Sequence, residues 1–201
     1  MLVDVHGDQS KARGAEVSPP DSDVTSPLVR SAVILDRDGV LNVDHGYVGQ
    51  VERLEWIPGA RRAVRRLNEA EVLAIVATNQ SGVARGLFSE ADVERVHQAM
   101  QEDLAREGAR IDAFYVCPFH DQAADPAYAH PDHPDRKPNP GMLLRAIAAF
   151  DLDPAHTVMI GDQARDLEAA RRAGILGVLF TGGDLDAFLQ STPAVTRLLE
   201  R

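Results

Sequence analysis

The residues most suited to chemistry are two aspartates, Asp36 and Asp38, which directly follow the apolar run SAVIL at residues 31–35. In an extended chain residues i and i+2 point to the same side, so both carboxylates could face one pocket. Two carboxylates this close repel each other, and one of them keeps its proton unless a cation compensates. Mg²⁺ suits such a place, because it binds carboxylates, waters and phosphate oxygens.

Other apolar segments also end in polar residues that could join this pocket. They are Thr78 and Asn79 at the end of residues 72–79, and Asp162 at the end of residues 156–162. Lys137, near the end of a long loop at residues 119–140, could reach the same pocket. Asp162 would give the cation a third carboxylate. Asp166 follows about one helical turn later, and could hydrogen-bond a metal-bound water or hold Lys137.

Carboxylates, Mg²⁺ and a lysine together are what phosphoryl transfer requires. The metal and Lys137 would neutralise a phosphate that otherwise repels an attacking carboxylate. Asp36 is then the predicted nucleophile, which forms an aspartyl-phosphate. Asp38 would protonate the leaving oxygen and later take a proton from the hydrolytic water. Thr78 would donate its hydroxyl to the phosphate.

The elements that must position these residues alternate along the chain from residue 31. The pattern predicts strands at 31–35, 72–79, 111–118, 156–162 and 175–183, helices at 58–70, 89–108, 139–152 and 164–174, and a short C-terminal helix. Nearly all-apolar strands that alternate with helices indicate a parallel sheet covered on both faces. Ligands of such folds bind at the carboxyl ends of the strands, where the polar residues above are expected to meet.

Composition narrows the class of protein further. The 201 residues carry a net charge of −10, which disfavours nucleic acid and anionic membranes as partners. One cysteine excludes an internal disulfide and indicates a reducing compartment, so we expect a cytoplasmic protein. No segment approaches the about 20 apolar residues of a membrane span. Residues 1–30 are polar and rich in Pro and Ser, which predicts a flexible arm before a single domain at 31–201; the alternative is an arm that packs on a partner subunit.

Four segments, DRDGVLN, TNQSG, RKPNPGML and GDQARD, resemble the four motifs of the haloacid dehalogenase (HAD) superfamily of phosphatases. The longer segments DRDGVLNVDHGYV and TNQSGVARG more closely resemble the D-glycero-D-manno-heptose 1,7-bisphosphate 7-phosphatases, which are related to the histidinol-phosphate phosphatases. The resemblance implies a Rossmann-like three-layer α/β/α fold with a mainly parallel sheet. It also implies Mg²⁺-dependent removal of the 7-phosphate from the heptose bisphosphate.

The resemblance extends to individual residues. It implies Asp36 as nucleophile, Asp38 as acid and base, and metal bound by Asp36, the Asp38 backbone carbonyl and Asp162. It implies substrate contacts from Asp44, His45, Gly46, Tyr47, Thr78, Asn79, Gln80, Ser81, Arg136 and Lys137. Residues 37–77 leave no room for a large cap domain, so the site should be fairly open, with specificity set by loops such as 42–48 and 119–135. Such a site suits a sugar phosphate.

The loop before RKP departs from the family pattern, in which a Cys-x-His and a Cys-x-Cys pair bind zinc. Cys117 matches, Phe119 stands at the histidine position, and His133 and Asp135 stand at the later cysteine positions. Cys117, His120, His133 and Asp135 could still form a mixed zinc site, with His130 as a spare ligand. The alternative is that zinc has been lost and that prolines and hydrogen bonds hold the loop.

A second departure is Gln163, where heptose bisphosphatase relatives often have a lysine that reaches the substrate. One alternative is therefore a related phosphatase of histidinol phosphate or another small phosphomonoester. Another is a non-catalytic binding module with this fold, which the intact set of Asp36, Asp38, Thr78, Lys137 and Asp162 argues against. Polynucleotide phosphatase activity is disfavoured by the acidic charge. We expect a monomer that binds a phosphorylated sugar.

Overall fold

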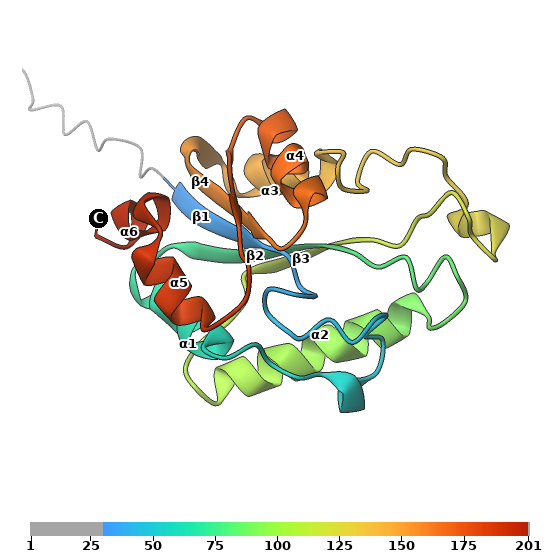
Figure 1. Cartoon of the computed structure of the whole chain (residues 1–201), viewed down its shortest axis with the longest axis horizontal. Coiled ribbons are helices and arrows are strands. Elements are labelled where there is room, and N and C mark those ends of the chain that lie inside the picture. Colours follow the sequence, from blue (N-terminus) through green and yellow to red (C-terminus); the bar gives the residue numbers. More distant parts are fainter. Residues whose placement is uncertain (1–29, 201) are drawn as a thin grey trace, which may run out of the picture.

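A computed structural model describes residues 30–200, so most of the predicted N-terminal arm lies outside the described residues. The centre of the molecule is a five-stranded parallel sheet with the strand order β3-β2-β1-β4-β5 (Figure 1). The strands are β1 (Arg30–Leu35), β2 (Leu73–Asn79), β3 (Ala113–Cys117), β4 (Leu152–Gly161) and β5 (Leu176–Leu179).

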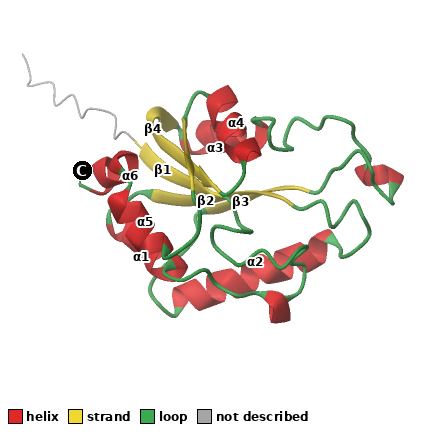
Figure 2. Ribbon diagram, viewed as in Figure 1, coloured by secondary structure: helices red, strands yellow, loops and turns green. Residues whose placement is uncertain are grey.

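Helices cover both faces of this sheet (Figure 2). They are α1 (Ala60–Glu69), α2 (Glu90–Ala105), α3 (Gly141–Phe150), α4 (Ala164–Ala173), α5 (Leu185–Ser191) and α6 (Pro193–Leu199). One hydrophobic core lies between the sheet and α1, α2, α5 and α6, and a second lies between the sheet and α3 and α4. The predicted three-layer α/β/α architecture is therefore confirmed.

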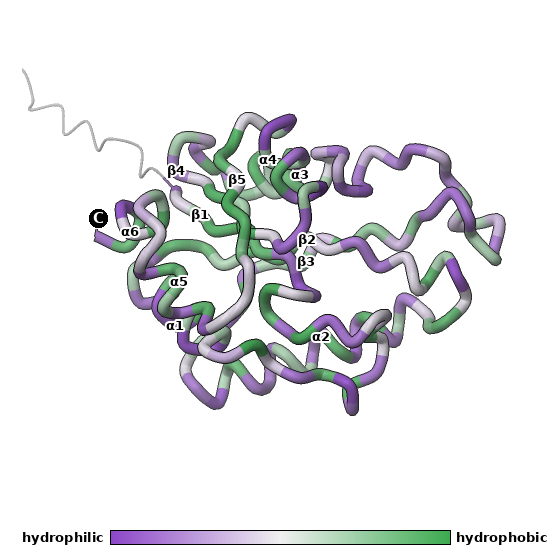
Figure 3. Tube along the Cα trace, viewed as in Figure 1, coloured by the Kyte–Doolittle hydropathy of each residue, from purple (hydrophilic) through white to green (hydrophobic). Residues whose placement is uncertain are grey.

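Strand β1 shows why the sheet needs two covering layers. Val33 and Leu35 belong to the first core and Ile34 belongs to the second, so successive side chains of one strand are buried on opposite faces. Figure 3 shows mainly hydrophobic strands and a mainly hydrophilic connection between β3 and α3. Pairing continues one residue past the strand, because Asp36 N donates to Ile160 O at 2.9 Å. The catalytic candidate is thereby fixed beside the end of β4.

The largest differences from the sequence prediction concern β4, β5 and the C-terminal helix. Strand β4 begins earlier than predicted, at Leu152, because this buried residue pairs with Arg30 at the edge of β1. Strand β5 is confined to the four residues that pair with β4. The single predicted C-terminal helix is two helices, since Pro193 cannot donate a backbone hydrogen bond and starts α6.

The connections contain little regular structure. Residues 36–59 hold the short 3₁₀ helix η1 (Val51–Arg53), and the loop between β3 and α3 holds η2 (Pro126–Tyr128). No cap domain is present between residues 30 and 200, in agreement with the prediction. Within the same range no helix is both long and apolar enough to cross a bilayer.

Candidate active site

The carboxyl ends of the three central strands bring the predicted residues together. Asp36 follows β1, Thr78 is near the end of β2, and Asp162 follows β4. Because these strands are neighbours in the order β2-β1-β4, residues far apart in the chain share one edge of the sheet. Lys137 reaches the same place from the loop before α3, and Asp166 reaches it from the first turn of α4.

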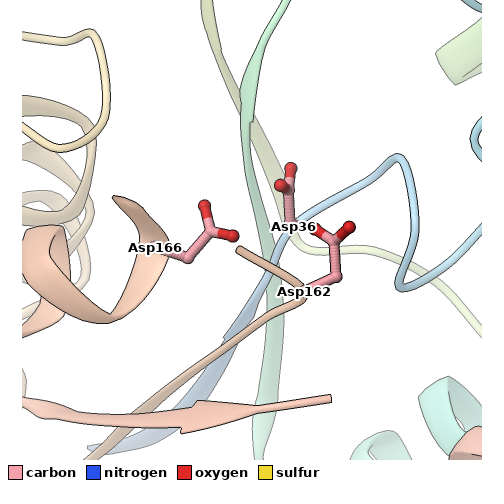
Figure 4. Close-up of side chains that lie close together, drawn as sticks. All are labelled: Asp36, Asp162 and Asp166. Carbon is pink, nitrogen blue, oxygen red and sulfur yellow. The ribbon is translucent and has the colours of Figure 1, made fainter. Parts of the chain in front are cut away.

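Three carboxylates form the centre of the site. Asp36, Asp162 and Asp166 each offer an oxygen within 4.8 Å of the other two, and in residues 30–200 no other such group of potential metal ligands occurs. Figure 4 shows Asp36 and Asp162 at adjacent strand ends, with Asp166 facing them from α4. Gly39 makes room for this arrangement, because a Cβ there would lie 2.4 Å from an oxygen of Asp162. The structure thus places Asp166 in the carboxylate cluster itself.

The electrostatics of this carboxylate cluster favour a bound cation. Burial raises the pKa of Asp36 to about 6; the charges of Asp166 and Asp38 add to this rise, and Lys137 opposes it. Three carboxylates lie close together, and one lysine pairs with two of them, so the cluster keeps negative charge that this lysine does not neutralise. Oxygen donors of this kind are the ligands that Mg²⁺ prefers, so the residues present fit that ion.

The side chain of Lys137 is completely buried, and its ammonium group contacts three oxygens of the protein. Its Nζ lies 3.0 Å from Asp36 Oδ1 and 2.8 Å from Asp166 Oδ1, and donates to Ala77 O at 2.7 Å. Asp166 therefore holds Lys137, which is one of its two predicted roles. Asn79 holds the Lys137 backbone, accepting from its N at 3.0 Å and donating to its O at 2.9 Å. The side-chain amide of Asn79 is thus occupied by the protein.

The carboxylate of Asp38 lies outside the carboxylate cluster. Its Oδ1 accepts from Arg37 Nε and Nη2, at 3.3 and 3.0 Å, and from Asn42 Nδ2 at 2.9 Å. Its Oδ2 accepts from Arg37 Nη2 at 3.0 Å and from Gln80 Nε2 at 2.8 Å. A metal contact from Asp38 would have to come from its backbone carbonyl, which stays a prediction.

Thr78 and Gln80 are hydrogen-bonded to each other at the end of β2, where the sequence predicts that Thr78 binds phosphate. Both side chains are buried, and Gln80 Nε2 donates to Thr78 Oγ1 at 2.9 Å. The Thr78 hydroxyl hydrogen is therefore free to be donated to a phosphate oxygen. The same amide nitrogen also contacts Asp38, so Gln80 links two of the predicted catalytic groups. Ser81, the next residue, is partly exposed.

The predicted substrate loop at residues 44–47 is exposed beside the site. Asp44 Oδ1 accepts from Gly46 N at 2.9 Å, and His45 Nε2 lies 2.7 Å from Glu55 Oε2. Tyr47, the last residue of the loop, is 46% exposed and has a positive φ of 56°.

Arg53 holds this loop together. Its guanidinium donates to the carbonyls of His45, Gly46 and Tyr47, at 2.8, 3.1 and 3.2 Å. The sequence analysis missed Arg53, because nothing local distinguishes it from other surface arginines.

Arg136 and two arginines whose charges act on it, Arg85 and Arg165, lack a carboxylate partner among residues 30–200. Arg85, Arg136 and Arg165 make no ion pair with any residue between 30 and 200, although most arginines of this acidic protein do. Arg136 Nη1 donates to Phe119 O at 3.1 Å. Burial lowers the pKa of Arg136, and the positive charges of Arg165 and Arg85 lower it further. Uncompensated positive charge of this kind attracts an anion.

The four zinc candidates do not converge. Cys117 Sγ is 4.0 Å from His133 Nδ1, but Asp135 lies beside Arg145, and His120 contacts Asp121 and Arg85. No three of their ligand atoms come within 4.8 Å of one another in the described chain. Their arrangement therefore does not fit a zinc ion.

Aromatic packing occupies the centre of this loop instead. The His133 ring stacks on Phe119, with centroids 4.0 Å apart and an interplanar angle of 5°, and His130 meets both rings edge-on. Phe119, at the position of a family zinc ligand, is thus a packing residue. The contacts agree with the alternative in which the loop is held without zinc.

Comparison with known proteins gives consistent matches. A family model described as HAD-hydrolase-like matches residues 135–195. The chain is 47% identical to a D-glycero-beta-D-manno-heptose-1,7-bisphosphate 7-phosphatase from Rhodopseudomonas palustris, over 80% of this chain and 89% of that protein. It is 41% identical to the Escherichia coli K12 protein of the same name, over 72% of this chain and 75% of that protein.

Solved structures show the same similarity. A HAD-like phosphatase from Mesorhizobium loti superposes with a TM-score of 0.72 at 37% identity, covering 85% of this chain and 78% of that one. The D,D-heptose 1,7-bisphosphate phosphatase from B. bronchiseptica, complexed with magnesium and phosphate, superposes with a TM-score of 0.68 at 36% identity. That match covers 81% of this chain and 87% of the other.

Proposed function

Because the chain belongs to the family of HAD-like D-glycero-D-manno-heptose-1,7-bisphosphate 7-phosphatases, we propose that it removes the 7-phosphate of that bisphosphate in a Mg²⁺-dependent reaction. The observation that carries the proposal is the cluster of Asp36, Asp162 and Asp166, two of which, Asp36 and Asp166, pair with the buried ammonium group of Lys137. Asp36, Asp162 and the backbone carbonyl of Asp38 would hold Mg²⁺, which supplies positive charge for the phosphate when it is bound, and Asp166 would hold Lys137 beside it.

Asp36 is suited to attack phosphorus with one particular oxygen. Its Oδ1 accepts from Arg37 N at 2.7 Å and lies 3.0 Å from Lys137 Nζ. These contacts fix Oδ1 and leave Oδ2 as the nucleophilic oxygen that forms the aspartyl-phosphate. Lys137 keeps Asp36 ionised and places positive charge beside the transferring group.

Asp38 and Thr78 complete the chemistry around the phosphate. Asp38 gives a proton to the departing sugar oxygen and later takes one from the water that hydrolyses the aspartyl-phosphate. The Thr78 hydroxyl donates to a phosphate oxygen. The two side chains share Gln80 as a hydrogen-bond partner, which supports their acting on the same group.

A second phosphate on the substrate accounts for the unpaired arginines. Arg85, Arg136 and Arg165 gather positive charge beside the loop that carries Lys137, and none of them forms an ion pair within residues 30–200. A bisphosphate would bring one phosphate to Asp36 and leave the other to such a region. Arg165 stands two residues after Gln163, so it can replace the positive charge that a lysine at 163 would supply.

The test is phosphate release with Mg²⁺ from heptose 1,7-bisphosphate in both anomers, histidinol phosphate and simple sugar monophosphates, with Asp36→Asn as the blank. Preferred cleavage of the heptose bisphosphate at position 7, absent in the variant, is the expected result. Variant-sensitive cleavage of another substrate alone would retain the chemistry and replace the substrate. Activity that survives Asp36→Asn would reject the mechanism.

The state and location of the enzyme form a second part of the proposal. We propose a cytoplasmic monomer that acts on a small molecule and binds neither nucleic acid nor membrane. The net charge of −10 supports the last two points, because phosphates are repelled outside the local arginines. Light scattering during gel filtration measures the oligomeric state, and a dimer mass would overturn that part.

A further inference from the structure

We propose that Arg37, which lies between the two catalytic aspartates, is a positioning residue that fixes the carboxylate of Asp38 for proton transfer. Arg37 would touch neither substrate nor metal and would act only through Asp38. The inference rests on the proposed function, because it requires Asp38 to be the acid and base.

Burial is the first argument. The Arg37 side chain is 0% exposed, and a charged side chain is almost never fully buried unless it is paired. Its charge is matched by Asp38, whose side chain is 19% exposed. The pair is therefore asymmetric, with an arginine inside the protein and a carboxylate that reaches the open site.

The contacts of the guanidinium show that its orientation is fixed. Besides its bonds to Asp38, Nη2 donates to Val48 O at 2.6 Å and to Gln80 Oε1 at 3.2 Å. Nη1 contacts His97 Nε2 at 3.4 Å. Each of the three guanidinium nitrogens therefore has a partner, which leaves the group no freedom to rotate.

His97 closes the inner side of this pocket. It belongs to α2, and its ring stacks on Phe114 of β3 with centroids 4.2 Å apart and an angle of 15°. A ring held in this way accepts from Arg37 at a fixed point. Helix α2 and strand β3 thus determine where the guanidinium lies, and through it where Asp38 lies.

The consequence for Asp38 is a carboxylate held beside the phosphate site. Gln80 Nε2 donates to Asp38 Oδ2 and to Thr78 Oγ1, at 2.8 and 2.9 Å, so the carboxylate is close to the hydroxyl that would bind phosphate. An acid that protonates a leaving group must keep this placement throughout the reaction. Arg37 and Gln80 provide it together.

The experiment uses the leaving group to separate positioning from general damage. The p-nitrophenolate of p-nitrophenyl phosphate leaves without a proton, whereas the alkoxide of benzyl phosphate or of the heptose bisphosphate needs one. Neither p-nitrophenyl phosphate nor benzyl phosphate contains a sugar, so sugar contacts do not affect the comparison between these two substrates. The constant kcat/KM reports the steps up to departure of the leaving group, which include proton donation by Asp38.

The variant is Arg37→Lys, which keeps the positive charge but loses the forked geometry. We expect kcat/KM to fall at least about 30-fold for benzyl phosphate and the heptose bisphosphate, and less than about threefold for p-nitrophenyl phosphate, because general acid catalysis supplies the larger factor. Asp38→Asn should show the same selectivity. The matched control is Arg66→Lys, since Arg66 makes a forked pair with Asp186 between α1 and α5, at 2.7 and 3.0 Å. It should leave all three constants unchanged.

Equal losses on all substrates in Arg37→Lys, or no loss, would overturn the inference. If thermal melting shows that Arg37→Lys does not fold, His97→Phe decides in the same way, because it keeps an aromatic ring on Phe114 and removes the acceptor of Arg37 Nη1. Failure of the proposed function would look different: wild-type protein inactive on the heptose bisphosphate, or Asp36→Asn still active on every substrate.

Discussion

Replacing Lys137 with methionine tests the electrostatic core of the site. Lys137 Nζ lies 3.0 and 2.8 Å from two buried carboxylates and donates to a carbonyl at 2.7 Å. Hydrogen bonds to charged groups contribute about 1.5–3 kcal/mol each. Proton uptake by Asp36 or Asp166 would recover part of this, so we expect a net loss of about 3–5 kcal/mol in the free energy of unfolding.

Urea denaturation in a metal-free buffer measures this loss, and phosphate release with Mg²⁺ should fall at least about 100-fold, as for loss of an oxyanion donor. Mg²⁺ should restore part of the stability, because it supplies charge to the same carboxylates. The control is Arg145→Met, which breaks the exposed pair with Asp135 and should cost no more than about 1 kcal/mol. A loss below about 1 kcal/mol in Lys137→Met, or activity within about tenfold of wild type, would refute the reasoning.

Three further outcomes are expected. Mg²⁺ should raise the Tm more above pH 6 than below it, because burial raises the pKa of Asp36 to about 6 and the ion must displace a proton below that value; a Mg²⁺ effect independent of pH would contradict this. In the absence of metal, the free energy of unfolding should fall as pH rises from 3.8, the ordinary pKa of an aspartate, toward 6, because the folded protein holds that proton more tightly than the unfolded chain does. Zinc chelators should leave the Tm unchanged, whereas Phe119→Ala should lower the free energy of unfolding by about 1–3 kcal/mol through the lost stack on His133; elemental analysis that finds one zinc per chain would contradict the first part. Arg165→Ala should raise KM for a sugar bisphosphate several-fold and leave KM for a monophosphate unchanged, and equal changes for both would place Arg165 outside the substrate site.

The strands and the residues at their carboxyl ends could be predicted well, because both depend on local patterns in the sequence. Apolar runs define the strands, parallel strands must share an edge at their carboxyl ends, and so Asp36, Thr78 and Asp162 had to meet. The helical spacing of Asp162 and Asp166 likewise anticipated that Asp166 could reach Lys137.

Contacts between distant segments could not be predicted in this way. The bonds of Asn79 to the Lys137 backbone and of Arg37 to His97 join residues 58 and 60 positions apart. Neither partner carries a local signal of the other. The loop between β3 and α3 was ambiguous for a similar reason. The types and spacing of its possible zinc ligands do not show whether the side chains converge on one point or stack on one another.

The contact between Arg37 and His97 of α2 has a consequence for how the enzyme acquires activity during folding. The segment from Asp36 to Asp38 is made early in the chain, but Arg37 Nη1 finds its acceptor only when His97 of α2 has packed against Phe114 of β3. A nascent chain that stops before β3 therefore has the nucleophile without the geometry. Competence for catalysis therefore also depends on the tertiary packing of a helix and a strand that contain no catalytic residue.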